Sequence, residues 1–350
     1  MSEIGKISAG FFDQIIGDKL GAERAEVSVP PGFGVDVSVV GLPGGLAMMM
    51  TSDPLSLIPS LGLAESAWLS VHLMANDMAT TGFAPMYGQF VLNLPAGFSK
   101  EDFSVYWDYI DRFCAQIGIA ITGGHTGFIE GQNSTIAGGG TLISIGPREE
   151  VLVSSGARTG DSILVTKSCA LSSTGILALS FPETIRQNLG KEILDQAQES
   201  FYHTSSLKDA LVAAGEKERH PEITAMHDVT EGGVLGAIYE MATASGKGVW
   251  VKNDQIPIGE AQRKICELFD LDSRYCIGAG SMIITCEENA SSRVIDRLNQ
   301  AGIPCVEVGQ IKEPEYGMKL ETEEGITDLI YYEKDPYWDA FYKAIQSNWK

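Results

Sequence analysis

The sequence lacks the features that mark membrane, exported and nucleic-acid-binding proteins. No apolar run reaches the ~18 residues that a bilayer-spanning helix needs. Residues 1–10 show no basic region followed by an apolar stretch, so no secretory signal is visible and we expect a cytoplasmic protein. Basic residues are scarce: 25 Lys and Arg stand against 46 Asp and Glu, and the net charge is −21. Nucleic acid and anionic membranes need a basic surface and are therefore excluded as partners.

Cysteine is also sparse and unpatterned. The six cysteines form no CxxC motif, and the closest pairs are ten residues apart. Structural zinc sites and the disulfide frameworks of small exported proteins show closer, recurring spacings. We therefore interpret the cysteines as buried thiols.

The sequence does contain enough apolar material for two mixed domains, with 350 residues and 44% hydrophobic content. Strand and helix patterns alternate through the first half and restart near Pro147, which predicts a mixed α/β fold. We expect an N-terminal domain over residues 1–147, a C-terminal domain over 148–330 and an aromatic helix over 331–350. The predicted elements include strands over 46–51, 119–122 and 223–226 and helices over 64–81 and 191–214.

Residues 226–246, MHDVTEGGVLGAIYEMATASG, place polar side chains directly before a predicted amphipathic helix. Thr230 is interpreted as the N-cap of this helix, and Glu231 suits the positive end of its dipole. Gly232 and Gly233 follow, although glycine lowers helix stability. Two explanations stay open, either close packing of a second backbone or a ligand that approaches the helix start.

The first half places oxygen ligands near predicted strand and helix ends. They are Asp36 in GVDVSVV, Asp53 in TSDP, and Asn76 with Asp77 late in a helix. Magnesium binds one or two carboxylates together with waters and phosphate oxygens, so carboxylates that converge from separate elements predict a metal–phosphate site. The glycines of GGHTG, residues 123–127, would let backbone N–H groups approach phosphate. The alternative explanation for these Asp and Asn residues is that they cap helices or form turns, and this applies above all to Asp53 before Pro54.

The order of these motifs resembles the superfamily of aminoimidazole ribonucleotide (AIR) synthetase, selenophosphate synthetase, thiamine-monophosphate kinase and the hydrogenase-maturation protein HypE. The motifs are GVDVSVV, MTSDP, ANDMATTGFAP, TGGHTG, GARTGDSILVTK and HDVTEGGVLGAIYEMA. HDVTEGG and NDMATTG look most like HypE, whereas VTKSCALSSTGILAL looks like HypE-related proteins without a settled activity. The resemblance runs from Gly5 to about Gly309 and is specific for the superfamily, but much less so for one reaction.

The resemblance implies a homodimer in which two N-terminal domains build a shared β-barrel, and a cleft in which ATP and Mg²⁺ serve to phosphorylate a substrate. By this likeness Asp36, Asp53 and Asp77 bind magnesium and phosphate, and Asn76 contacts the nucleotide or metal. The other implied site residues are Gly123, Gly124 and Thr126 on the phosphate side, and Asp228, Gly232 and Gly233, with His227 beside them, on the substrate side. The expected catalytic residues are Asp77, Asp228 and His125.

Three departures separate this chain from the family pattern. Val35 stands where the family has a second carboxylate in GDDA, so fewer metal ions or weaker binding are expected. His125 replaces the acid of GGDT, and imidazole is a poor magnesium ligand. His125 therefore either contacts a phosphate when protonated or fills the loop of a degraded ATPase. The last residues, 346–350, lack the C-terminal cysteine that accepts the carbamoyl group in HypE, so hydrogenase cyanation is not expected.

The leading hypothesis is a HypE-like ATP-dependent enzyme that phosphorylates or dehydrates a small carbonyl, amide or phosphate-bearing substrate. The alternatives are a kinase of the thiamine-monophosphate type and a non-catalytic nucleotide-binding dimer or maturation partner. With a net charge of −21, the protein needs metal ions to neutralise a triphosphate. Lys6 and Lys167 are candidate cations, and each is interpreted as a solvated surface lysine.

Overall fold

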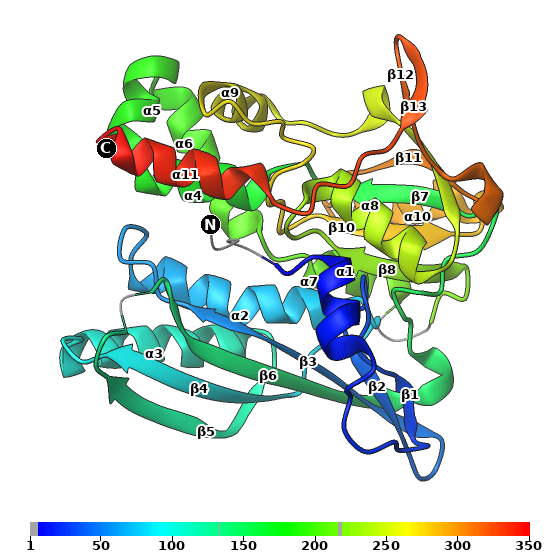
Figure 1. The fold of residues 1–350 in the computed structure, drawn as a ribbon, viewed down its shortest axis with the longest axis horizontal. Helices are drawn as coiled ribbons and strands as arrows, with labels where there is room; N and C mark the ends of the chain where they lie inside the picture. The colour runs from blue at the N-terminus through cyan, green and yellow to red at the C-terminus, as the bar shows by residue number, and fades with distance from the viewer. Residues whose placement is uncertain (1–5, 133, 216–218) are drawn as a thin grey trace.

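The computed structural model describes residues 6–132, 134–215 and 219–350, and it shows two α/β layers stacked on one another (Figure 1). Within these ranges the strands form two sheets, of six and seven strands, one in each half of the chain. The two-domain mixed α/β prediction is therefore confirmed. Each of the six cysteines is a buried free thiol, also as predicted. In the described part of the chain, every helix is too short or too polar to cross a bilayer.

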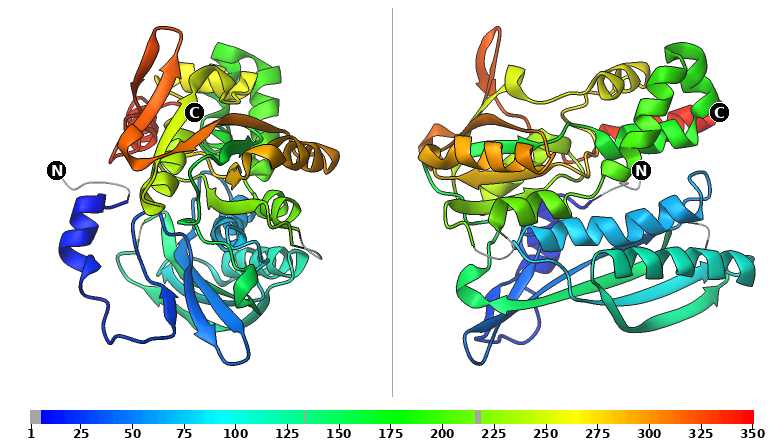
Figure 2. Two further views of the ribbon diagram at one scale, coloured as in Figure 1. Left: turned by 90° about the vertical axis from the view of Figure 1, so that its right-hand side faces the viewer. Right: turned by 180° about the vertical axis from the view of Figure 1, so that it is seen from behind.

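The first sheet has the strand order β1-β2-β3-β6-β4-β5, and all its neighbours are antiparallel except β4 and β5. Its strands are β1 (Val27–Val29), β2 (Ser38–Leu42), β3 (Leu46–Ser56), β4 (Tyr87–Pro95), β5 (Ala120–Ile129) and β6 (Ile136–Pro147). Helices α2 (Leu63–Ala79) and α3 (Lys100–Gln116) cover the face that is turned towards the second half (Figure 2). The described strands leave this sheet open within one chain, so the expected barrel would need a second copy.

The second sheet has the order β13-β12-β9-β11-β7-β10-β8, with β12 and β9 as its parallel pair. Its strands are β7 (Ser162–Thr166), β8 (Ile223–Asp228), β9 (Gly248–Lys252), β10 (Met282–Cys286), β11 (Cys305–Lys312), β12 (Met318–Thr322) and β13 (Gly325–Asp328). The helices of this half are α4 (Leu171–Ser180), α5 (Pro182–Leu189), α6 (Lys191–Ser200), α7 (Leu207–Ala214), α8 (Gly233–Ala244), α9 (Glu260–Leu268), α10 (Ser291–Gln300) and α11 (Pro336–Gln346). Two hydrophobic clusters cover its two faces, one including α8 and the other α7 and α10.

Helix α2 lies at the join between the halves. Its buried face, which includes Val71, Met74 and Met78, packs on β3 and β6 as the apolar spacing predicts. On its other side α2 contacts α7 and β8 of the second half. The short N-terminal helix α1 (Ala9–Phe12) continues into a π-helical turn and lies beside the same join (Figure 1). Residues of α2 can therefore meet residues from both domains.

Several predicted boundaries are wrong for reasons that depend on tertiary contacts. Strand β3 does not stop before Pro54 but continues to Ser56, because a register shift against β6 accommodates the proline. The predicted helix over 191–214 is broken into α6, a 3-10 turn and α7. Helix α8 begins at Gly233 with Gly232 as its N-cap, so Thr230 is not the cap.

Candidate functional site

Four aspartates from four elements converge at the join between the two halves. Asp36 lies two residues before β2, Asp53 lies on β3, Asp77 lies near the end of α2 and Asp228 ends β8. Since alternate residues of a strand share a face, Thr51 and Asp53 both point towards α2. There the Thr51 hydroxyl donates a hydrogen bond of 3.0 Å to Oδ2 of Asp77. The prediction that carboxylates far apart in sequence come together is thus met by the geometry.

Strand β8 contributes His227 and Asp228 from the second half. One ligand atom each of Asp36, His227 and Asp228 lies within 4.8 Å of the others. Nε2 of His227 is 3.5 Å from Oδ1 of Asp36 and 3.5 Å from Oε2 of Glu240, while Nδ1 donates to the Asp228 carbonyl oxygen at 2.7 Å. The Ser154 hydroxyl donates to the other oxygen of Asp36 at 2.9 Å. Asp36 therefore accepts a hydrogen bond on one oxygen and faces the His227 imidazole, across 3.5 Å, with the other.

Burial and mutual repulsion make these carboxylates weak acids. Burial, together with the charges of Asp228, Asp53 and Asp36, raises the pKa of Asp77 well above its ordinary value. Burial and the neighbouring Asp36 raise the pKa of Asp228 to about 7, and burial raises the pKa of Asp53 to about 6. The pKa of Asp36 is raised by burial, although His227 opposes the shift. Such a cluster is poised to lose protons when a cation enters.

Lys6 brings a positive charge to the acidic cluster. Its ammonium donates to the Thr230 hydroxyl at 2.9 Å, and its backbone N–H donates to Oε2 of Glu231 at 2.9 Å. Desolvation lowers the pKa of Lys6, but the carboxylates of the cluster, led by Glu240, outweigh this effect and raise the pKa above its usual value. The residue as a whole is exposed, yet its ammonium turns towards the carboxylates rather than to bulk solvent. Lys6 is thus a surface lysine, as predicted, but its ammonium is bound to Thr230 next to the acidic cluster.

A small cavity adjoins Asp36 on the side of the N-terminal segment. Its volume is about 220 Å³. It is lined by Lys6, Ile7, Ala9, Phe12, Gly32, Phe33, Gly34, Val35, Asp36, Glu240 and Tyr331. Gly34 packs tightly on α8, because a Cβ there would lie 2.5 Å from the Glu240 carbonyl oxygen. Of the four aspartates only Asp36 lines this cavity, and we use the name acidic cleft for the cavity together with the adjoining aspartate cluster.

The donor atoms of the acidic cleft fit a divalent cation. Carboxylate oxygens dominate, which is the ligand set that magnesium prefers. Among the described residues, Oδ2 of Asp228 and Nε2 of His227 are buried without a hydrogen-bond partner, a state that buried polar atoms rarely keep. Burial lowers the pKa of His227, but Asp36, Glu240 and Asp228 outweigh it and raise the pKa. His227 is thus better suited to pair with Asp36 as an imidazolium than to bind a metal.

The GGHTG segment lies away from the acidic cleft within one chain. Gly123, Gly124, His125 and Thr126 belong to β5 and are exposed, so the prediction of a loop at this point is wrong. Strand β5 is an edge strand, and β6 and β4 separate it from β3, which amounts to about 14 Å at ordinary strand spacing. A Cβ at Gly124 would lie 1.8 Å from the Phe90 carbonyl oxygen, so close strand pairing accounts for this glycine. The phosphate-side roles of these residues and the catalytic role of His125 stay predictions.

Packing also accounts for the glycines at the start of α8. A Cβ at Gly233 would lie 2.5 Å from the Arg274 carbonyl oxygen, and Gly232 has a φ of 82°. The Gly232 N–H donates to Oδ2 of Asp335 at 2.7 Å, so a carboxylate of the chain itself faces this end of the helix. Of the two explanations left open by the sequence, packing is the one that these contacts support. A substrate-side role for the two glycines stays a prediction.

Asn76 joins the two domains instead of facing the carboxylates. Its Nδ2 donates to the Thr204 carbonyl oxygen at 2.9 Å, and its Oδ1 accepts from the Ser206 N–H at 2.7 Å. Both ends of the amide are therefore engaged by main chain of the second half. Asn76 is fully buried by these contacts, and its expected contact with a nucleotide or metal stays a prediction.

Sequence reasoning missed Glu240, which lies at the acidic cleft in α8. It is buried and accepts a hydrogen bond of 2.8 Å from the hydroxyl of Tyr331. Helical periodicity gave no signal, because it places Glu240 on the side opposite to the apolar face that Ile238 and Met241 share. The structure nevertheless buries this charged residue. Such a residue is rarely buried without a partner or a task.

Comparison with known proteins agrees with this two-domain organisation. Residues 34–145 match the family model described as AIR synthase related protein, N-terminal domain. Residues 158–320 match AIR synthase related protein, C-terminal domain. Together the two models span both domains and all four aspartates of the cleft.

Two curated proteins and two solved structures illustrate the likeness. The carbamoyl dehydratase HypE of Azotobacter vinelandii is 27% identical over 82% of each chain. The selenide, water dikinase of Methanococcus maripaludis is 26% identical over 80% of this chain and 84% of that protein.

A HypE–HypF complex contains a chain that superposes with a TM-score of 0.71 at 17% identity, covering 92% of this chain and 99% of that one. A HypE structure in complex with ATP gives a TM-score of 0.66 at 20% identity, covering 96% and 98%. These identities support the fold, and the two family models together span most of the chain. The chain belongs to the AIR synthase-related superfamily.

Proposed function

We propose that this protein binds ATP with Mg²⁺ in the acidic cleft and uses it to phosphorylate an oxygen atom of a small carbonyl, amide or phosphate-bearing substrate. The observation that carries the proposal is the convergence of Asp36, Asp53, Asp77 and Asp228, whose pKa values are all raised. The relatives support it, since they include a carbamoyl dehydratase and a selenide, water dikinase, and one structural neighbour was solved with ATP.

Asp36, Asp53 and Asp77 are the residues that would hold magnesium. When bound, the ion would neutralise charge on the triphosphate, which phosphoryl transfer requires more than covalent help from the protein. The pairing of His227 with Asp36 and of Thr51 with Asp77 fixes the orientation of these two carboxylates. Lys6 supplies a second positive charge from the N-terminal segment, on the side where Thr230 and Glu231 hold it.

Asp228 is the residue best suited to accept a proton from the substrate. Its pKa of about 7 lies near neutral pH, where a general base combines a usable ionised fraction with useful basicity. Its Oδ2 is buried and has no hydrogen-bond partner among the described residues, so this atom is available to an N–H or O–H group of the substrate. We therefore assign proton acceptance to Asp228 and cation binding to the other three aspartates.

Calorimetry and product analysis test the proposal. ATP should bind in the presence of Mg²⁺, and chelation by EDTA should abolish binding. Phosphorus NMR after incubation with candidate amides, carbonyl compounds or phosphate esters then separates transfer to a kept product from dehydration with release of phosphate. Binding without turnover on any candidate would favour the non-catalytic nucleotide-binding alternative, and absence of binding would contradict the proposal.

We also propose that the open face of the first sheet pairs with a second copy. Phe90 and Leu92 of β4 pack towards the helices, whereas Val91 between them points away and is 42% exposed. Ile129 on the edge strand β5 is exposed as well, and it is in register with Pro95 of β4, which lies on the same face as Val91. An apolar sheet face of this kind is typical of an interaction surface.

Val91→Glu should therefore convert a dimer to a monomer, because it would bury a charge at the interface. The matched control is Val105→Glu on α3, where the valine is equally exposed at 44% but belongs to the opposite layer. Sedimentation velocity measures both variants. A monomeric wild-type protein, or a dimer that survives Val91→Glu, would contradict this assignment.

A further inference from the structure

Lys167 combines an unusual backbone conformation with a partly buried side chain. It directly follows β7 and has a φ of 57°, in the left-handed region that glycine adopts without strain. A lysine there keeps a strained backbone conformation, so its side chain is expected to have a specific task. The interpretation of Lys167 as a solvated surface lysine is wrong.

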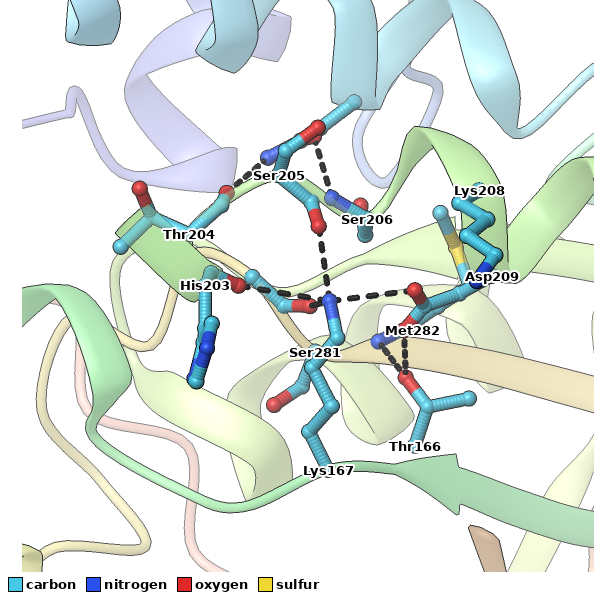
Figure 3. Close-up of polar contacts among 12 residues, drawn as sticks. Thr166, Lys167, His203, Thr204, Ser205, Ser206, Lys208, Asp209, Ser281 and Met282 are labelled. Carbon is cyan, nitrogen blue, oxygen red and sulfur yellow. Dashed lines mark hydrogen bonds and ion pairs between the residues drawn. The ribbon is translucent and has the colours of Figure 1, made fainter. Parts of the chain in front are cut away.

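The ammonium of Lys167 is surrounded by oxygen atoms (Figure 3). It donates to the carbonyl oxygens of Ser205 at 2.7 Å, Gly280 at 2.8 Å and His203 at 3.3 Å. It also pairs with Oδ1 of Asp209 at 3.1 Å. Three carbonyl oxygens and one carboxylate make up the kind of oxygen cage that holds a hard cation.

Asp209 is itself fixed in place. It is buried, and its Oδ2 accepts a hydrogen bond of 2.6 Å from the Thr166 hydroxyl. That hydroxyl accepts in turn from the Met282 N–H at 2.9 Å. The cage is thus built from the residue after β7, from α7 and the turn before it, and from the segment before β10, which are far apart in sequence.

His203 and Ser205 belong to residues 203–206, which form hydrogen bonds with α2. We call these residues the grip segment. Both ends of the Asn76 amide bind it, as described above. Nδ1 of His72 lies 3.0 Å from the Ser205 hydroxyl, and the indole N–H of Trp68 donates to the Thr204 hydroxyl at 2.9 Å. One face of α2 is therefore tied to the grip segment up to the residue before Asp77.

The third carbonyl connects the cage to Asp228. Gly280 lies two residues before Met282, and Met282 is paired with Asp228 where β10 meets β8. The Lys167 ammonium thus has contacts on two sides. It binds the grip segment, which is attached to the helix of Asp77, and it binds the segment before β10, which is paired with the strand of Asp228.

We propose that Lys167 is a positioning residue of the acidic cleft, acting as a tethered cation that keeps the grip segment on α2 and so sets Asp77 against Asp228. The geometry of the cage stands without a nucleotide. The consequence for ATP rests on the function proposed above.

Two substitutions separate the role of the charge from that of the side-chain volume. Lys167→Gly removes the ammonium, relieves the backbone strain and leaves room for a free ion. Lys167→Met removes the charge but keeps the stem, so a free ion has little room. Lys208→Met is the matched control, because the Lys208 ammonium also donates to a carbonyl oxygen, that of Ala301 at 2.8 Å, but at an exposed site.

Amide hydrogen exchange without nucleotide tests the proposal. In choline chloride, both Lys167 variants should exchange about tenfold faster at Ser206 and in the last turns of α2, because the grip loosens. Ammonium or potassium chloride at the same ionic strength should restore Lys167→Gly but not Lys167→Met, and Lys208→Met should match the wild type throughout. The proposal would be overturned if Lys167→Gly exchanged at the wild-type rate, or if its exchange rates were the same in choline and in ammonium. It would also be overturned if Lys167→Gly failed to fold even with ammonium.

Calorimetry measures the effect of Lys167 on MgATP affinity. MgATP binding to Lys167→Gly should weaken about tenfold in choline. It should recover in ammonium, because the bound ion restores the position of Asp77 relative to Asp228. If the wild type binds no MgATP, the proposed function is wrong. The hydrogen-exchange rates of the grip segment, measured without nucleotide, still test the role of Lys167. Normal MgATP affinity in a variant whose grip segment exchanges fast would contradict the coupling to Asp77.

Discussion

Asp77→Asn should reduce Mg²⁺-dependent ATP turnover about 100-fold to 1,000-fold, which is the loss expected when one preorganised charged group at a phosphoryl-transfer site is removed. The substitution removes a carboxylate that faces Asp36, Asp53 and Asp228. ATP affinity with Mg²⁺ should fall with turnover, whereas neither the variant nor the wild type should bind ATP after chelation of the metal. Turnover assays and calorimetry measure the two effects.

The folded protein should tolerate this substitution. The pKa of Asp77 is raised well above its ordinary value by burial and by its acidic neighbours, so the ionised carboxylate is disfavoured before a cation enters. Asparagine has the same shape, is neutral and can still accept the hydrogen bond from Thr51. The melting temperature without ligand should therefore hold or rise. Asp108→Asn on the exposed face of α3 is the control, and unchanged turnover in Asp77→Asn would contradict the assignment.

The stability of the ligand-free protein should fall as the pH rises from about 5 to about 8. The pKa of Asp53 is about 6 and that of Asp228 about 7 in the folded protein, against a reference value of 3.8. A group whose pKa is raised by folding stabilises the fold fully below its unfolded pKa, and this stabilisation is lost as the pH rises through the folded pKa. The raised pKa of His227 acts in the same direction.

Magnesium should reverse this loss. The ion binds the ionised carboxylates and so should raise the melting temperature by several degrees near pH 8 and hardly at all near pH 5. Asp228→Asn should flatten the pH profile of the ligand-free protein, since it removes one of the groups that must ionise. Thermal unfolding across the pH range, with and without Mg²⁺, measures both effects. A magnesium effect of equal size at both pH values would show that the ion binds elsewhere.

The four aspartates could be identified from the sequence because their local motifs carry the signal. Asp36, Asp53, Asp77 and Asp228 each stand in a short motif with a defined order along the chain. Their convergence then follows from a mixed two-domain fold, in which α2 and β8 come to lie against each other. The apolar period of α2 also predicted its limits to within two residues.

The remaining features depend on contacts that no local pattern reports. The sequence GGHTG predicts a loop, but this segment pairs with β4 as part of β5, and the Phe90 carbonyl leaves space only for glycine at position 124. Lys6 looks like a solvated lysine until the second domain places Thr230 and Glu231 beside it. Asn76 looks like a ligand because it precedes Asp77, yet it binds main chain from residues more than 120 positions away.

A structure of the protein with Mn²⁺ and a non-hydrolysable ATP analogue tests the central claim most directly, since the anomalous signal locates the ion independently of the protein. The account predicts Mn²⁺ bound by oxygens of Asp36, Asp53 and Asp77, with the triphosphate between the two domains and its charge facing Lys6. A well-ordered nucleotide bound elsewhere, with the four aspartates free of metal, would contradict it.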